Sequence, residues 1–228
     1  MGRFRALAIT TLLLGGTAML PSAAQAALFI STANDSIVQL NANGGGATST
    51  VEITSLPGPW VANGTAGPGA KWISWADTGA GSNDTTPDDS VTPWMTVAES
   101  FTASAGQSLT GGTVYADDTV RVLLKNVTDD ILVTTLVNPA IGQDGACAAG
   151  APGCQAGEGA AFAFAGLEAG KSYQVLFEVF QRAGNGFGVQ YAFSVVPIPG
   201  AALLFGSALA GLAWVRRRGQ KADAPLAA

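Results

Sequence analysis

The stretch YQVLFEVF, residues 173–180, decides how this chain folds. Successive side chains of an extended strand point to opposite sides, so its Tyr, Val, Phe and second Val share one face. The other face carries Gln, Leu, Glu and Phe, a mixed set typical of a partly exposed surface. The stretch therefore predicts a strand that packs one face against a core and leaves the other near solvent.

Other short alternating stretches recur along the middle of the chain, separated by turn-forming residues. Turns are predicted at 41–46, 129–130 and 184–186. No segment of the middle carries the apolar stripe of an amphipathic helix. We therefore predict an all-β fold, a single jelly-roll-like β-sandwich. The further predicted strands are 36–40, 51–56, 100–104, 119–124, 131–137, 161–167 and 188–196.

The N-terminus has the three parts of a secretory signal peptide. Arg3 and Arg5 precede a short apolar run, and Ala24 and Ala26 are the small residues that a signal peptidase reads. Residues 1–26 are thus predicted to be a signal peptide cleaved after Ala26. The alternative is an uncleaved anchor helix, which the short run disfavours because a span needs about 20 apolar residues.

The C-terminus predicts a transmembrane helix. Residues 198–215 contain no charge and one polar side chain, Ser207. As a helix they rise about 27 Å, close to the thickness of a bilayer core. The basic cluster that follows predicts that this end lies in the cytoplasm, with residues 221–228 as a short cytoplasmic tail. A buried helix of a globular domain is the alternative, and the absence of a polar face disfavours it.

The residues around this helix carry a resemblance. The motif Val196-Pro197-Ile198-Pro199 precedes the helix, and Arg216, Arg217 and Arg218 follow it. This tripartite tail, residues 196–220, resembles the PEP-CTERM sorting signal. Ile198 stands where the commonest form has Glu, so the tail is most similar to the VPLPA-type variant.

The resemblance implies where the protein goes. Bacteria that make exopolysaccharide place such tails on exported proteins, and an exosortase in the inner membrane recognises them. It implies an inner-membrane-anchored protein that is then passed to the cell envelope or extracellular matrix. A plain single-pass membrane anchor is the alternative.

Residues 27–195 are then the exported domain, long enough for one core. They hold five basic and fifteen acidic residues, a net charge of −10, which disfavours nucleic acid as a partner. The chain has no histidine and two cysteines, Cys147 and Cys154. In an exported protein they predict a disulfide that closes a small loop, with two free thiols as the alternative.

Two tryptophans are candidates for glycan binding. Trp72 and Trp75 lie three residues apart, so an extended strand places them on opposite sides. At most one of them then joins the core of a two-layer fold, and an exposed indole offers a flat surface for a sugar ring. The alternative is that both indoles are buried, which is usual for tryptophan.

An acidic run offers a candidate calcium site. Asp84, Asp88 and Asp89 lie within ten residues of one another, and clustered carboxylates can hold Ca2+ in the loops of secreted domains. No cofactor is otherwise expected. The alternative is that these are acidic turn residues that face water.

A second, looser resemblance concerns residues 108–126, SLTGGTVYADDTVRVLLKN. They resemble a piece of the secreted galactose-binding-like sandwiches, which implies a hairpin of two strands with Asp117 and Asp118 at its turn. No catalytic motif accompanies it, and the missing histidine excludes Ser-His-Asp chemistry. We expect a non-enzymatic surface protein with a structural or carbohydrate-binding role, possible partners being exopolysaccharide and the exosortase. The alternative function is a carbohydrate-active enzyme with paired carboxylates.

Overall fold

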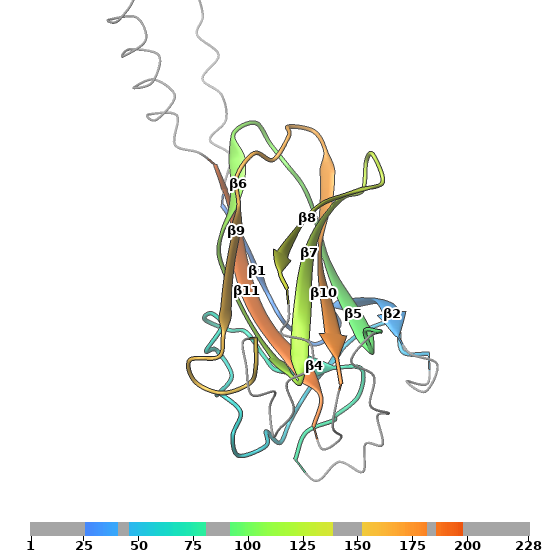
Figure 1. Cartoon of the computed structure of the whole chain (residues 1–228), viewed down its shortest axis with the longest axis vertical. Coiled ribbons are helices and arrows are strands. Elements are labelled where there is room, and N and C mark those ends of the chain that lie inside the picture. Colours follow the sequence, from blue (N-terminus) through green and yellow to red (C-terminus); the bar gives the residue numbers. More distant parts are fainter. Residues whose placement is uncertain (1–25, 41–45, 81–91, 139–151, 182–185, 198–228) are drawn as a thin grey trace, which may run out of the picture.

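The computed structural model describes residues 26–40, 46–80, 92–138, 152–181 and 186–197, and these residues contain strands and no helix (Figure 1). The strands in chain order are β1 (Ala27–Ile30), β2 (Ser36–Leu40), β3 (Val51–Glu52), β4 (Ile73–Ser74), β5 (Met95–Thr102), β6 (Gln107–Asp117), β7 (Thr119–Asn126), β8 (Ile131–Val137), β9 (Ala160–Phe164), β10 (Ser172–Phe180) and β11 (Gly188–Pro197).

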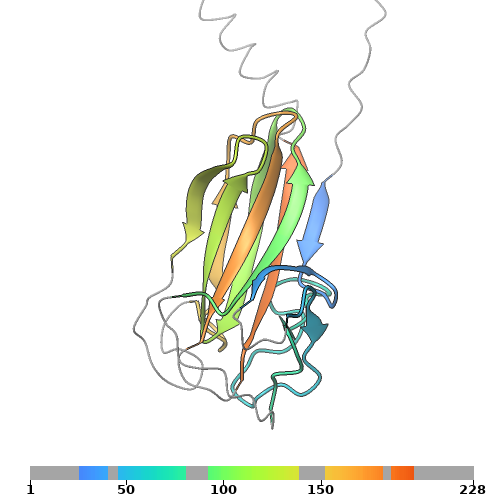
Figure 2. The ribbon, with the colours of Figure 1, turned by 90° about the vertical axis from the view of Figure 1, so that its right-hand side faces the viewer.

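The strands form two sheets that face each other as layers (Figures 1 and 2). The first sheet has the order β3-β4-β11-β6-β9, and β1 also pairs with β11. The second sheet has the order β2-β5-β10-β7-β8. The pairings are antiparallel in both sheets. The prediction of an all-β sandwich is therefore confirmed.

Every predicted strand is present, although the boundaries differ. β2 and β8 match their predicted ranges, whereas the range 51–56 contains only the two residues of β3. β5 begins five residues before its predicted start, at Met95. β11 runs on to Pro197, where its last two residues pair with Ser108 and Gln107 of β6. The alternation alone does not predict β1, β4 and β6. β1 and β4 are too short to show a period, and β6 (Gln107–Asp117) is implied only by the resemblance of residues 108–126.

The hairpin implied for residues 108–126 is wrong. β6 pairs with β11 and β9 in the first sheet, whereas β7 pairs with β10 and β8 in the second. The chain thus crosses from one sheet to the other at Asp117 and Asp118. Both strands have an inward apolar face, and burying both in one core favours placing them in opposite layers.

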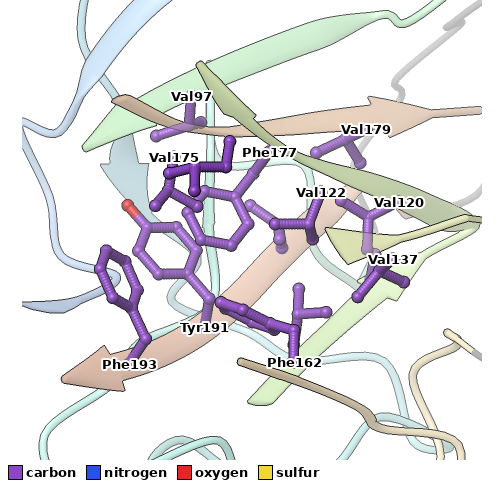
Figure 3. Close-up of a cluster of buried hydrophobic side chains, with 14 of the residues drawn as sticks. Val97, Val120, Val122, Val137, Phe162, Val175, Phe177, Val179, Tyr191 and Phe193 are labelled. Atoms are coloured by element: carbon purple, nitrogen blue, oxygen red, sulfur yellow. The ribbon is translucent and has the colours of Figure 1, made fainter. Parts of the chain in front are cut away.

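The main core lies between the sheets and comes from the alternation seen in the sequence. β7 and β10 alternate strictly between buried and half-buried residues until the last position of β10. Phe177 of β10 meets Tyr191 of β11 from the opposite sheet, with ring centroids 3.8 Å apart and the planes 8° from parallel (Figure 3). In Figure 3 the valines labelled around this pair come from the second sheet, and Phe162 and Phe193 come from the first.

A second apolar cluster covers the outer face of the first sheet. It contains Ile53, Trp60, Val61, Trp72, Tyr115 and Cys154. Tyr115 belongs to β6, and the other members come from outside the long strands. The segment 53–72, rich in Gly and Pro, therefore does not lie loose in solvent but packs as a cover on the sheet.

Side-chain amides hold this cover in place. Gln190 of β11, fully buried, accepts a hydrogen bond from the Ala66 amide at 2.7 Å and donates one to the Ala62 carbonyl at 3.2 Å. Asn63 accepts a hydrogen bond from the Trp72 amide at 2.8 Å. Because a buried loop leaves backbone groups without strand partners, these amides satisfy groups that would otherwise be costly to bury.

Candidate functional site

Trp72 is not an exposed platform. Its side chain is fully buried, its Nε1 donates to the Val61 carbonyl at 2.8 Å, and its ring lies 4.2 Å from that of Trp60. The interpretation of Trp72 as a glycan-binding residue is therefore wrong. The cause is the cover segment, which buries the outer face of a strand that a bare two-layer sandwich would leave open.

Trp75 lies on the other side, as the spacing predicts. It is half-buried and packs against the main core, where it stacks on Trp94 with ring centroids 6.1 Å apart and planes 7° from parallel. The buried Nε1 atoms of both indoles have no hydrogen-bond partner within the described part of the chain. Trp75 is thus not joined to Trp72 in one binding surface, and glycan binding by Trp75 stays a prediction.

Several predicted site residues lie outside the described ranges. These are Ala24, Asp84, Asp88, Asp89, Cys147, Ile198, Pro199, Arg216, Arg217 and Arg218. Cys154 is described, is fully buried in the second cluster and is disulfide-bonded. Within the described ranges, no group of three or more His, Cys, Asp or Glu residues could hold a metal ion. The proposed calcium site therefore stays a prediction.

The ends of the described part bear on the export motifs. Ala26 is exposed and directly precedes β1. Val196 and Pro197 are the last residues of β11. Among the residues that the structure describes, no helix is long and apolar enough to cross a membrane, and residues 198–215 lie outside them.

The sheet-to-sheet corner holds a buried acidic pair. Asp117 and Asp118 are only 5% and 3% exposed. Asp117 accepts a hydrogen bond from Trp60 Nε1 at 2.7 Å. Burial, together with the hydrogen bond and negative charge of Asp118, raises the pKa of Asp117 well above its usual range. Two carboxyl groups that share a proton are common in hydrolases, but this pair is closed off from solvent and holds the cover segment through Trp60.

A second acidic cluster lies between the sheets. The Tyr191 hydroxyl is 2.8 Å from Asp35 Oδ2 and 2.8 Å from Glu99 Oε1. Tyr191 belongs to the first sheet, Glu99 belongs to β5 of the second, and Asp35 lies in the connection from β1 to β2 where the chain crosses between them. Burial and the charge of Asp35 raise the pKa of Glu99 to about 7, against the hydrogen bond from Tyr191, which lowers it.

The alternation of residues in β5 indicates that Glu99 points toward the core. Val97, Glu99 and Phe101 share one face of β5, and Val97 is a core residue. An acidic residue on the apolar face of a strand indicates a buried carboxyl group that needs a partner. No such signal exists for its partners, because Asp35 and Tyr191 are remote in sequence and meet it only in the fold.

Comparison with known proteins gives no match: no protein-family model matches the chain, and no curated protein or solved structure is significantly similar to it. The function therefore has to be argued from the residues and the fold.

Proposed function

We propose that this chain is an exported bacterial surface protein, anchored in the inner membrane by residues 198–215 and sorted by a PEP-CTERM-type signal of the VPLPA kind. Its jelly-roll-like sandwich serves a structural role in the cell envelope or the extracellular matrix. The proposed partner at the membrane is an exosortase. Both the sorting and the role rest first on the tail, Val196 to Arg218, which joins a Pro-x-Pro motif, an uncharged run and an arginine cluster.

The ends of the sandwich are compatible with this route. Cleavage after Ala26 would remove the leader and leave β1, which begins at Ala27, complete. β11 ends at Pro197, directly before the proposed helix. β1 and β11 are antiparallel neighbours, with Ala27 opposite Val195. Both proposed membrane-directed segments therefore leave the sandwich from the same end, as a domain tethered there would require.

The burial of the aromatic side chains supports a structural role over carbohydrate binding. Among the described residues, the large apolar side chains with high exposure are aliphatic: Leu28, Val38, Val51, Val127, Ile131 and Leu132. Sugar rings are bound largely by exposed aromatic faces, and the described aromatic residues are all buried or half-buried. Trp75 is the residue that keeps carbohydrate binding as the second candidate function.

The route is tested by expressing the full-length chain in a bacterium that makes exopolysaccharide. We expect the purified protein to begin at Ala27 by mass spectrometry and to be found in the membrane and envelope fractions. Replacing Arg216, Arg217 and Arg218 with Glu should prevent its stable anchoring. Recovery of the intact chain, leader included, from the cytoplasm would contradict the proposal.

The role is tested by glycan binding of the full-length chain. We expect no saturable binding of exopolysaccharide fragments if the sandwich is structural. Saturable binding that is lost in Trp75→Ala, and kept in a control such as Leu28→Ala, would establish the second candidate instead. An enzymatic role would appear as release of reducing ends from the same fragments.

A further inference from the structure

The cluster of Asp35, Tyr191 and Glu99 contains too many acceptors for one hydroxyl proton. Tyr191 Oη lies 2.8 Å from an oxygen of each carboxyl group. A phenol has one O–H and so donates one hydrogen bond, whereas an ionised carboxylate only accepts. Two contacts of hydrogen-bond length therefore need two protons among the three groups, and one carboxyl group must be protonated.

The surroundings of the two carboxyl groups place the second proton on Glu99. Asp35 also accepts hydrogen bonds from the amide and the hydroxyl of Thr32, both at 2.8 Å. Both oxygens of Asp35 thus already act as acceptors. Among the described residues, Tyr191 is the one side-chain partner of the Glu99 carboxyl group, and Val175 is the residue paired with Glu99 on β10. Protonated Glu99 then donates to Tyr191, which donates to Asp35.

The charged and titratable groups around Glu99 do not offset this arrangement. The groups that act on it are Asp35 from the β1–β2 connection and Tyr191 from β11, and neither is a cation. The inward residues of β10 beside it are apolar apart from Tyr173. The described lysines and arginines that form ion pairs do so with other carboxylates. Loss of the Glu99 proton therefore brings two negative charges against one hydroxyl, with no compensating cation among the described residues.

We propose that Asp35, Tyr191 and Glu99 form a proton-dependent clip between the two sheets. The clip is closed when Glu99 is protonated and ties β11 of the first sheet, β5 of the second and the crossing between β1 and β2. When Glu99 loses its proton, one hydroxyl proton remains for two carboxylates, so one of the two bonds to Tyr191 is lost and repulsion drives the carboxylates apart. The raised pKa of Glu99, about 7, places this transition near neutral pH.

The neighbouring backbone shows what the clip would release. Ser31 and Tyr191 exchange hydrogen bonds, Ser31 N to the Tyr191 carbonyl at 3.0 Å and Tyr191 N to Ser31 Oγ at 3.0 Å. The Asp35 amide donates to Thr50 Oγ1 at 3.0 Å. Opening the clip loosens the crossing segment 31–35, because this segment carries Asp35, which then competes with the Glu99 carboxylate for one hydroxyl proton and is repelled by it.

The experiment compares the full-length chain with Glu99→Gln in mild detergent between pH 5.5 and 8.5. Glutamine is neutral throughout and can still donate to Tyr191, so it keeps the clip closed. We expect amide exchange of segment 31–35, corrected for the intrinsic pH dependence, to speed up by more than about tenfold in the wild type and to stay nearly constant in Glu99→Gln. The exposed Glu168→Gln is the matched control and should behave as the wild type.

A direct titration keeps the test valid if a variant does not fold. With 13C-labelled glutamate carboxyl groups, the Glu99 resonance of the wild-type chain should titrate near neutral pH. Tyr191→Phe keeps the ring stacked on Phe177 and removes the hydroxyl. With this substitution present, chains with Glu99 and chains with Glu99→Gln should show the same pH dependence of amide exchange in segment 31–35. Titration of Glu99 near pH 4.5, or the same pH dependence of exchange in wild type and Glu99→Gln, would overturn the proposal.

Discussion

Phe177 and Tyr191 lie face to face across the two sheets, with ring centroids 3.8 Å apart. Phe177 is fully buried and Tyr191 is also at 0% exposure. Their strands, β10 and β11, are the third member of each sheet's order and thus central in both layers. This pair joins the layers at the middle of the core, and its hydroxyl end carries the acidic cluster.

Phe177→Ala should therefore be strongly destabilising. Removing a fully buried aromatic ring loses its transfer free energy and leaves a cavity, so we expect the free energy of unfolding to fall by about 3–5 kcal/mol. Urea unfolding followed by tryptophan fluorescence measures the change. Leu28→Ala, at a side chain that is 59% exposed, is the control and should cost little. Equal losses in the two variants would mean that the core does not lie between the sheets.

The hydrogen bond from Trp60 to Asp117 can be isolated with two matched substitutions. Trp60 and Trp94 are both buried, but Trp60 Nε1 donates to Asp117 whereas Trp94 Nε1 has no hydrogen-bond partner among the described residues. Trp60→Phe and Trp94→Phe remove similar ring volume. We expect Trp60→Phe to cost about 1–3 kcal/mol more, because it leaves a buried acceptor unsatisfied. A smaller loss for Trp60→Phe in urea unfolding would contradict the role given to this bond.

Asp117 should make the stability depend on pH. Its pKa is raised in the folded state, so the folded chain keeps a proton that an unfolded aspartate, with a pKa near 3.9, has lost at higher pH. The contribution to stability is therefore full below about pH 4 and is lost as the pH rises toward the folded pKa. Asparagine carries no such proton. The advantage of the wild type over Asp117→Asn in unfolding free energy should therefore shrink between pH 4.5 and pH 9. Urea unfolding at several pH values measures this difference, and a constant difference would argue against a shared proton.

Two glycines test whether the cover segment packs on the first sheet. A Cβ at Gly67 would lie 2.5 Å from the Cβ of Ala192 in β11, whereas a Cβ at Gly58 would meet nothing within 4 Å. Gly67→Ala should cost about 1–3 kcal/mol, because the backbone has to move to relieve the overlap. Gly58→Ala should be neutral or slightly stabilising. Thermal melts of both variants provide the measurement, and an unchanged midpoint for Gly67→Ala would show that the cover is not held against β11.

The strands were predictable because their pattern is local. The alternation in residues 173–180 and 119–124 predicts which side chains face the core, and β10 and β7 keep that alternation. The antiparallel sandwich follows from many such short strands and no helical stripe. The range 51–56 was predicted too long because its last four residues leave the sheet, and Ile53, the first of them, joins the second cluster instead.

The candidate site was less predictable, and Trp72 shows why. Its spacing from Trp75 correctly places the two indoles on opposite sides, but spacing contains no information on what covers the outer side. The segment 57–70 reads as a loop because it is rich in Gly and Pro. It packs as a cover because Gln190 satisfies two of its buried backbone groups and Asn63 satisfies the backbone amide of Trp72.

By itself, the sequence determined the class of the fold, the inward face of each long strand and the expectation of export, since each depends on residues within a few positions of one another. Only the tertiary structure decided that Trp72 is buried, that Asp117 and Asp118 turn a corner between sheets, and that Tyr191 meets Glu99 from 92 positions away and Asp35 from 156. The physical reason is that side-chain periodicity is a property of one strand. Burial, proton sharing and charge repulsion depend on which strands the fold brings into contact.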